Sequence, residues 1–203
     1  HHFRSDTEAL HLAVSVVFSS IFKKYSLPCI IVGGQSAAYW MRVPGSRDID
    51  FVSPDINNIS SVLEKCGFER SRDFSFRFNH TKANVMIEFV GEKIDIAGIE
   101  SCSSVAVEPV DIEDSLVKSM MPGPAEILDP VCVFLNYVNA FQPGTIWHNY
   151  NDEGALATER AQALFELYEE YIRKGILEKF QSGEIHKTLS KVLREHFNLL
   201  MRE

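Results

Sequence analysis

The first third of the chain alternates helical and strand patterns of hydrophobic and polar residues. Residues 5–25 place apolar side chains three or four positions apart, which predicts an amphipathic helix. A short apolar run at 29–32 predicts a buried strand, and a short helix is expected at 36–41. A second strand is expected at 48–52, and an amphipathic helix at 57–66. Helices and short strands in this order favour a mixed α/β domain.

The middle of the chain changes to the two-residue alternation of strands. Residues 73–78 alternate polar and aromatic side chains, and 83–90 is a stronger apolar strand. A turn after it predicts a hairpin with a third run at 93–97. The following segment is harder to interpret, and one more short strand is expected at 105–107.

Helical patterns return after the Pro-Gly-Pro break at 122–124. Residues 131–141 are almost continuously apolar, which predicts a buried helix. Amphipathic helices are expected at 153–174 and 184–202. The chain therefore divides into an α/β part and an all-helical part.

Length and composition agree with this division. The chain has 203 residues, 45% of them hydrophobic, which is enough to bury a core. We expect an α/β (α+β) domain at 1–125 and a helical C-terminal region at 126–203. No apolar run is long enough to cross a bilayer, and no signal-peptide pattern is present. His1 and His2 read as the end of a purification tag and are left out of functional reasoning.

Charge and cysteine content narrow the functional classes. The formal net charge of −8 argues against an extended nucleic-acid surface, although it allows one local basic pocket or a substrate bound through a metal. The cysteines are far apart and form no CxxC pair; they are Cys29, Cys66, Cys102 and Cys132. We expect buried, reduced thiols in a cytoplasmic protein and no zinc site.

Two acidic residues on the second predicted strand are the strongest chemical signal. Asp48 and Asp50 are two positions apart, so their side chains point to the same face of a strand. Two neighbouring carboxylates repel each other unless a cation lies between them. A divalent cation such as Mg²⁺ is the natural partner, because it takes hard oxygen ligands and shares them with substrate phosphates.

The order of these pieces resembles the nucleotidyltransferase superfamily. The resemblance rests on Val32-Gly33-Gly34, on Asp48-Ile49-Asp50-Phe51 and on Ile87-Glu88-Phe89, which together lie within residues 29–90. Each motif alone is common, and their joint order and spacing are much rarer. Residues 33–37 and 47–51 look most like the AbiEii/AbiGii-type toxin-like nucleotidyltransferases. The resemblance implies a mixed sheet flanked by helices.

The resemblance also implies a phosphate-binding role for the residues around the glycine pair. Gly33 and Gly34 would let the backbone approach a triphosphate closely. Ser36 would offer its hydroxyl and nearby backbone N–H groups to phosphate oxygens, unless it is only a helix cap. Arg47 is a further candidate phosphate ligand. A regular strand places it on the face opposite to Asp48, and its alternative role is a surface ion pair.

A third acid would complete the metal site that Asp48 and Asp50 begin. Glu88 fits the apolar–acid–apolar pattern, and residues 76–80 precede its strand as an expected antiparallel neighbour. Asp95 fits the same pattern and remains a rival. The third acid would bind a second metal or accept the proton of an attacking hydroxyl.

The helix at 129–141 departs from the toxin-like relatives. These usually carry a lysine there, and this chain has none. Asn136 and Asn139 are the polar residues expected to face a pocket, or else to bond neighbouring helices. His80 and His148 are candidate acid–base groups whose alternative role is structural.

We therefore expect a metal-dependent nucleotidyltransferase that uses Mg²⁺ and moves an NMP group from an NTP to an acceptor hydroxyl. The candidate acceptors are RNA, a protein and a small cationic molecule, and the toxin-like resemblance implies an antitoxin partner. The alternative is an inactive protein of the same fold that serves as a nucleotide-binding or protein-interaction module. A third interpretation is an unrelated α/β domain with exposed acids.

Overall fold

The computed structural model describes residues 6–41, 45–74, 76–95 and 102–140, together with 166, 170 and 174. The chain forms two compact units. The first comprises His1–Asp95 and Cys102–Asp129, and the second comprises Ile96–Ser101 and Pro130–Glu203. The sheet and most of the helices described below belong to the first unit, and α5 (Pro130–Ala140) belongs to the second.

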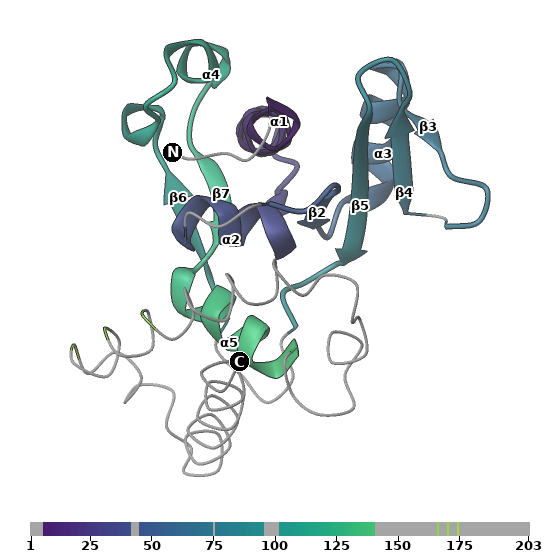
Figure 1. Ribbon diagram of the computed structural model, residues 1–203. Helices are drawn as coiled ribbons and strands as arrows, with labels where there is room; N and C mark the ends of the chain where they lie inside the picture. Colours follow the sequence, from purple (N-terminus) through teal and green to yellow (C-terminus); the bar gives the residue numbers. More distant parts are fainter. Residues whose placement is uncertain are drawn as a thin grey trace. The chain divides into compact units, whose positions relative to one another are not determined.

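A seven-stranded mixed sheet organises the first unit, with the strand order β3-β4-β5-β2-β1-β7-β6 (Figure 1). The strands are β1 (Ile30–Ile31), β2 (Ile49–Val52), β3 (Glu69–Arg70), β4 (Arg77–His80), β5 (Val85–Gly91), β6 (Ser104–Val107) and β7 (Ala125–Leu128). The β1–β7 and β2–β5 pairs are parallel, and the other pairs are antiparallel. The expected mixed sheet flanked by helices is confirmed.

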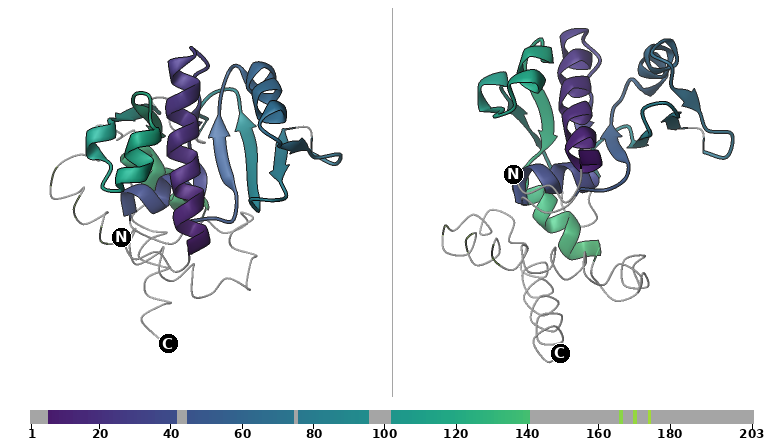
Figure 2. Two further views of the ribbon diagram at one scale, coloured as in Figure 1. Left: turned by 90° about the horizontal axis from the view of Figure 1, so that it is seen from above. Right: turned by 45° about the horizontal axis from the view of Figure 1, so that its top comes forward.

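The helices of the first unit are α1 (Asp6–Lys24), α2 (Gly33–Met41), α3 (Ile56–Lys65) and α4 (Ser115–Met120), with a short 3₁₀ turn at Pro109–Asp111. The long helix α1 lies across the middle strands of the sheet, as Figure 2 shows. No helix in the described ranges is long and apolar enough to span a membrane.

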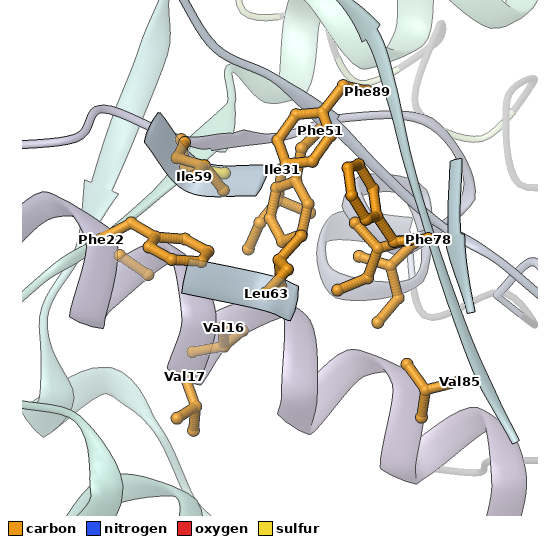
Figure 3. Packing of buried hydrophobic residues seen from close by; sticks show 14 of the residues in the cluster. Val16, Val17, Phe22, Ile31, Phe51, Ile59, Leu63, Phe78, Val85 and Phe89 are labelled. Atoms are coloured by element: carbon orange, nitrogen blue, oxygen red, sulfur yellow. The ribbon is translucent and has the colours of Figure 1, made fainter. Parts of the chain in front are cut away.

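The hydrophobic core lies between one face of the sheet and the helices α1 and α3. Val16 and Phe22 of α1 and Leu63 of α3 pack in one cluster with inward-facing strand residues such as Phe51 and Phe78 (Figure 3). Ring contacts join Phe51, Phe78 and Phe89 at centroid distances of 6.0 Å. This burial fixes which face of β2 and β5 points inward, and therefore which face is left for polar side chains.

Alternation along β2 and β5 separates the two faces. Ile49 and Phe51 of β2 are fully buried, and Ile87 occupies the same layer in β5. Asp50 and Glu88 alternate with them and are half-buried on the other face. The core therefore determines the orientation of the acidic residues.

Most of the elements predicted in the first ninety residues are confirmed within a few positions. The helix expected at 36–41 begins earlier, at Gly33, so the glycine pair is its first turn rather than a loop before it. The strand expected at 105–107 is confirmed as β6.

Three predictions about the strands are wrong or incomplete. The hairpin strand expected from residue 93 does not form over the described residues 93–95, because β5 continues to Gly91, where it still pairs with Val52 of β2. Residues 73–74 are outside β4, because the chain turns there and the Arg77 N–H donates to the Phe74 carbonyl at 3.1 Å. The strands β3 and β7 and the helix α4 were not predicted.

Two further expectations concern the helical half and the cysteines. The helix expected at 131–141 is confirmed as α5, whereas those expected at 153–174 and 184–202 lie almost entirely outside the described residues. Cys29 and Cys132 are buried as expected, but Cys66 is exposed at the end of α3.

Candidate active site

The first two positions of α2, in its first turn after β1, require glycine. Gly33 has φ +59°, and a Cβ there would lie 2.1 Å from the Asp50 Oδ2 atom. A Cβ at Gly34 would lie 2.4 Å from the Ser46 hydroxyl oxygen. Because glycine has neither a Cβ nor a strong penalty at positive φ, the start of α2 can lie directly against the Asp50 carboxylate.

Three carboxylates converge beside this turn. Asp48 and Asp50 come from the β2 segment and Glu88 comes from β5, where it is the register partner of Asp50. One carboxylate oxygen from each of the three residues lies within 4.8 Å of the others, and all three residues are half-buried. Hard oxygen donors at this spacing suit a divalent cation such as Mg²⁺.

The electrostatics of the site also fit a cation. The pKa of Asp50 is raised to about 7, first by its burial and then by the negative charges of Asp48 and Glu88, while Arg77 acts in the opposite direction. A carboxyl group that is hard to ionise in the empty site would ionise readily beside a divalent cation. Both the spacing and the negative charge of the three carboxylates therefore suit a divalent cation.

Arg77 on the neighbouring strand contacts the third acid. It stands opposite Glu88 in the antiparallel β4–β5 pair and donates to the Glu88 Oε2 atom from Nε at 3.1 Å and from Nη2 at 2.7 Å. Its guanidinium lies 4.3 Å from the centroid of the Phe74 ring. The sequence analysis did not single out Arg77; its signal was an arginine in the strand expected to pair with that of Glu88.

Gln35 is a second residue that the sequence analysis missed. Its side chain is fully buried, and Nε2 donates to the carbonyls of Ser46 at 2.9 Å and Asp48 at 3.1 Å. The Ser46 hydroxyl also donates to the Asp48 carbonyl, at 2.7 Å. These bonds attach the segment before β2 to α2 and thereby position Asp48 beside Asp50.

Other predicted site residues lie apart from the carboxylates. Ser36 is fully buried and its hydroxyl donates to the Gly33 carbonyl at 2.8 Å, so a phosphate contact would require that bond to break. Arg47 is exposed and lines a hollow of about 840 Å³ whose described lining includes His11 and Asn84 but none of the three acids. Asp95 is exposed and is not a member of the carboxylate group.

Of the histidine and asparagine candidates, the structure describes the side chains of His80 and Asn136. His80 uses Nδ1 to accept the backbone N–H of Ala83 at 3.0 Å, which is a local structural role. Asn136 is half-buried on α5 in the second unit. The side chain of Asn139 and the whole of His148 lie outside the described residues.

Comparison with known proteins adds information about the fold. No family model matches the sequence, and no curated protein matches it significantly. Among solved structures, the chain is similar to an antigenic nucleotidyltransferase-like protein from Paracoccidioides brasiliensis, with a TM-score of 0.57 and 12% identity over 96% of this chain and 92% of that one. The chain has a nucleotidyltransferase fold.

A second solved structure is similar at a lower level. It is ANT(2")-Ia in complex with adenylyl-2"-tobramycin, with a TM-score of 0.48 and 10% identity over 93% of this chain and 99% of that one. The similarity to the Paracoccidioides brasiliensis protein, at 12% identity, shows the fold alone, and a shared fold does not establish a shared activity.

Proposed function

We propose that this protein is a metal-dependent nucleotidyltransferase that moves an NMP group from an NTP to an acceptor hydroxyl. The observation that carries the proposal is the convergence of Asp48, Asp50 and Glu88 within 4.8 Å. It gains support from the adjacent Gly33, whose missing Cβ leaves the start of α2 in contact with Asp50. A surface cluster of acids without this backbone approach would not argue for phosphate chemistry.

In this proposal the three acids are the ligands of a divalent cation, which we take to be Mg²⁺. When bound, the cation supplies charge stabilisation for the triphosphate and the departing pyrophosphate. The backbone N–H groups of Gly33, Gly34 and Gln35, at the start of α2, would donate to phosphate oxygens, because the first N–H groups of a helix have no intrahelical carbonyl partner. The Ser36 N–H is already used, since it donates to the Val32 carbonyl at 3.4 Å. Gly33 and Gly34 keep that approach open.

The reaction is a displacement at the α-phosphorus. The acceptor oxygen forms a new bond to that phosphorus while the bond from the α-phosphorus to the bridging oxygen breaks, and pyrophosphate leaves with the bond's electron pair. The proton of the acceptor hydroxyl passes to a carboxylate of the cluster. The chain's own contribution is orientation: Gln35 and the β2–β5 register hold the acids on one side of the reacting phosphate.

We also propose a narrower assignment on the basis of the motifs at 33–37 and 47–51, which look most like the AbiEii/AbiGii-type toxin-like enzymes. This assignment predicts an RNA or protein acceptor, an antitoxin partner and a cytoplasmic location. The net charge of −8 would equally suit a small cationic acceptor.

Calorimetric titration with each NTP, in Mg²⁺ and in EDTA, tests the proposal. We expect Mg²⁺-dependent binding that Asp48→Asn and Asp50→Asn abolish. Asp95→Asn is the matched control, because Asp95 is exposed outside the cluster. Equal binding by all of these proteins would refute the proposal.

Incubation with labelled NTP, total RNA and lysate then asks whether a group is transferred. Label in a macromolecule or small molecule would identify the acceptor. Mg²⁺-dependent binding without any transfer would instead support the inactive nucleotide-binding module.

A further inference from the structure

The three carboxylates carry like charges at short range, and the described part of the chain supplies one ionic partner for them. Asp48 and Asp50 form no ion pair with any residue in the described ranges. Glu88 pairs with Arg77, whose Nη2 lies 2.7 Å from the Glu88 Oε2 atom. Arg77 therefore provides the positive charge next to the cluster.

Several contacts hold the ion pair between Arg77 and Glu88 in place. Arg77 and Glu88 are directly opposite each other in the β4–β5 pair, and two guanidinium nitrogens donate to the same carboxylate oxygen. The centroid of the Phe74 ring lies 4.3 Å from the Arg77 guanidinium carbon. Both charged side chains are about a quarter exposed, 28% for Arg77 and 26% for Glu88, so solvent screens the pair only in part.

The Glu88 carboxylate accepts the hydrogen bonds of Arg77 and would also be a ligand of the cation. Both hydrogen bonds from Arg77 go to Oε2. A cation held by the cluster would therefore share Glu88 with the guanidinium at short range. The formal charge of three carboxylates and one guanidinium is −2, which matches a single divalent cation.

We propose that Arg77 is a built-in counterion of the carboxylate cluster: it stabilises the empty site and lowers the affinity of that site for a divalent cation. The proposal rests on the proposed function, because it assumes that the cluster binds a metal. Arg77 is a positioning residue in this account, since it acts through Glu88. Arg77 would neutralise part of the negative charge when no cation is bound, which keeps the site folded. Its positive charge would repel a bound cation and so favour release of the cation after turnover.

Arg77→Met tests this directly. The variant removes the charge and keeps most of the apolar stem beside Phe74. We expect a lower melting temperature in EDTA and, in titrations with Mg²⁺ alone, a Kd about tenfold lower than that of the wild type, because a unit charge near a divalent ion is lost. Arg77→Lys keeps the charge and should bring the Kd back to within about twofold of the wild-type value.

Arg70→Met is the matched control. Arg70 lies one strand further out, pairs with Glu64 at 3.6 Å, and has its guanidinium 5.3 Å from the Phe78 ring centroid. This variant loses the same kind of charge, ion pair and ring contact, but away from the cluster. We expect its Mg²⁺ affinity to equal that of the wild type.

An Arg77→Met protein with unchanged or weaker Mg²⁺ binding would overturn the counterion proposal while leaving the metal site intact. Absence of Mg²⁺ binding in the wild type and in Arg70→Met would instead overturn the proposed function. If Arg77→Met does not fold, Arg77→Gln takes its place, since it also removes the charge and keeps a polar side chain that can donate to Glu88. That variant should bind Mg²⁺ more tightly than the wild type, and equal affinity would again overturn the counterion proposal.

Discussion

Replacing Gly33 with alanine tests whether the glycine turn and the carboxylate site are one structural unit. Gly33 has φ +59°, and an alanine Cβ would lie 2.1 Å from Asp50 Oδ2 and 3.0 Å from Asp50 Cβ. Left-handed backbone alone costs a non-glycine residue about 1–2 kcal/mol. The clash adds to this cost, because α2 or the Asp50 side chain must move.

We therefore expect Gly33→Ala to lower the free energy of unfolding by about 2–5 kcal/mol, combining the backbone strain with an overpacking cost of about 1–3 kcal/mol. For a chain of this size, each kcal/mol corresponds to a shift of about 2–4 °C in the melting temperature. Urea denaturation and calorimetry measure both quantities. Gly123→Ala is the control, since a Cβ at Gly123 meets nothing within 4 Å, and its effect should stay within about 0.5 kcal/mol.

A double-mutant cycle separates strain from clash. In an Asp50→Ala background the contact at 2.1 Å is gone and only the Cβ contact at 3.0 Å remains. The cost of Gly33→Ala should then fall by about 1 kcal/mol or more. Full additivity of the two substitutions would refute the contact between the turn and the carboxylate.

The other predictions concern pH, the Gln35 contacts and the core. Because the pKa of Asp50 is raised to about 7 in the folded protein, its proton stabilises the fold at low pH, and that contribution is lost as pH rises from about 4 to about 7. In thermal melts in EDTA, Asp50→Asn should therefore gain stability relative to the wild type as pH increases. A difference in stability that stays constant with pH would contradict the burial and charge repulsion at Asp50. Gln35→Met removes two hydrogen bonds to the carbonyls before β2, so it should lower the free energy of unfolding in urea by about 1–3 kcal/mol and weaken Mg²⁺ binding. Unchanged Mg²⁺ affinity would show that Asp48 is positioned without the Gln35 hydrogen bonds. Phe51→Ala removes a fully buried ring that stacks on Phe89 and should cost about 3–5 kcal/mol, and a loss below 1 kcal/mol would contradict the packing of this core.

Local patterns were sufficient to predict the two acids of the β2 segment. Alternation places Asp48 and Asp50 on one face because Ile49 and Phe51 must be buried, and this is the arrangement that the structure has. The apolar neighbours of Glu88 indicated its strand in the same way. In each case the signal lies within five residues of the chain.

Long-range pairing could not be predicted in this way. The parallel register that sets Glu88 beside Asp50 depends on the position of β5 next to β2, thirty-eight residues later in the chain. The four-residue strand β7 follows a Pro-Gly-Pro break and enters the sheet between β1 and β6, where tertiary contacts rather than local propensity decide its structure.

Asp95 shows that a local pattern can also select a residue that strand pairing keeps out of the carboxylate group. Its neighbours fit the expected pattern for the third acid, yet the bulge in the β2–β5 register and the pairing of Val52 with Gly91 end the strand before it. Arg77 became significant only once the β4–β5 register was known. Pattern alone identifies candidates, and register decides which of them meet.

Diffraction from crystals soaked in Mn²⁺, a substitute for Mg²⁺ with a strong anomalous signal, tests whether the three acids bind one divalent cation. We expect one anomalous peak coordinated by carboxylate oxygens of Asp48, Asp50 and Glu88, and its loss in Asp50→Asn crystals. Well-diffracting crystals that show no peak at these oxygens, or a peak held by Asp95 instead, would contradict the proposed metal site.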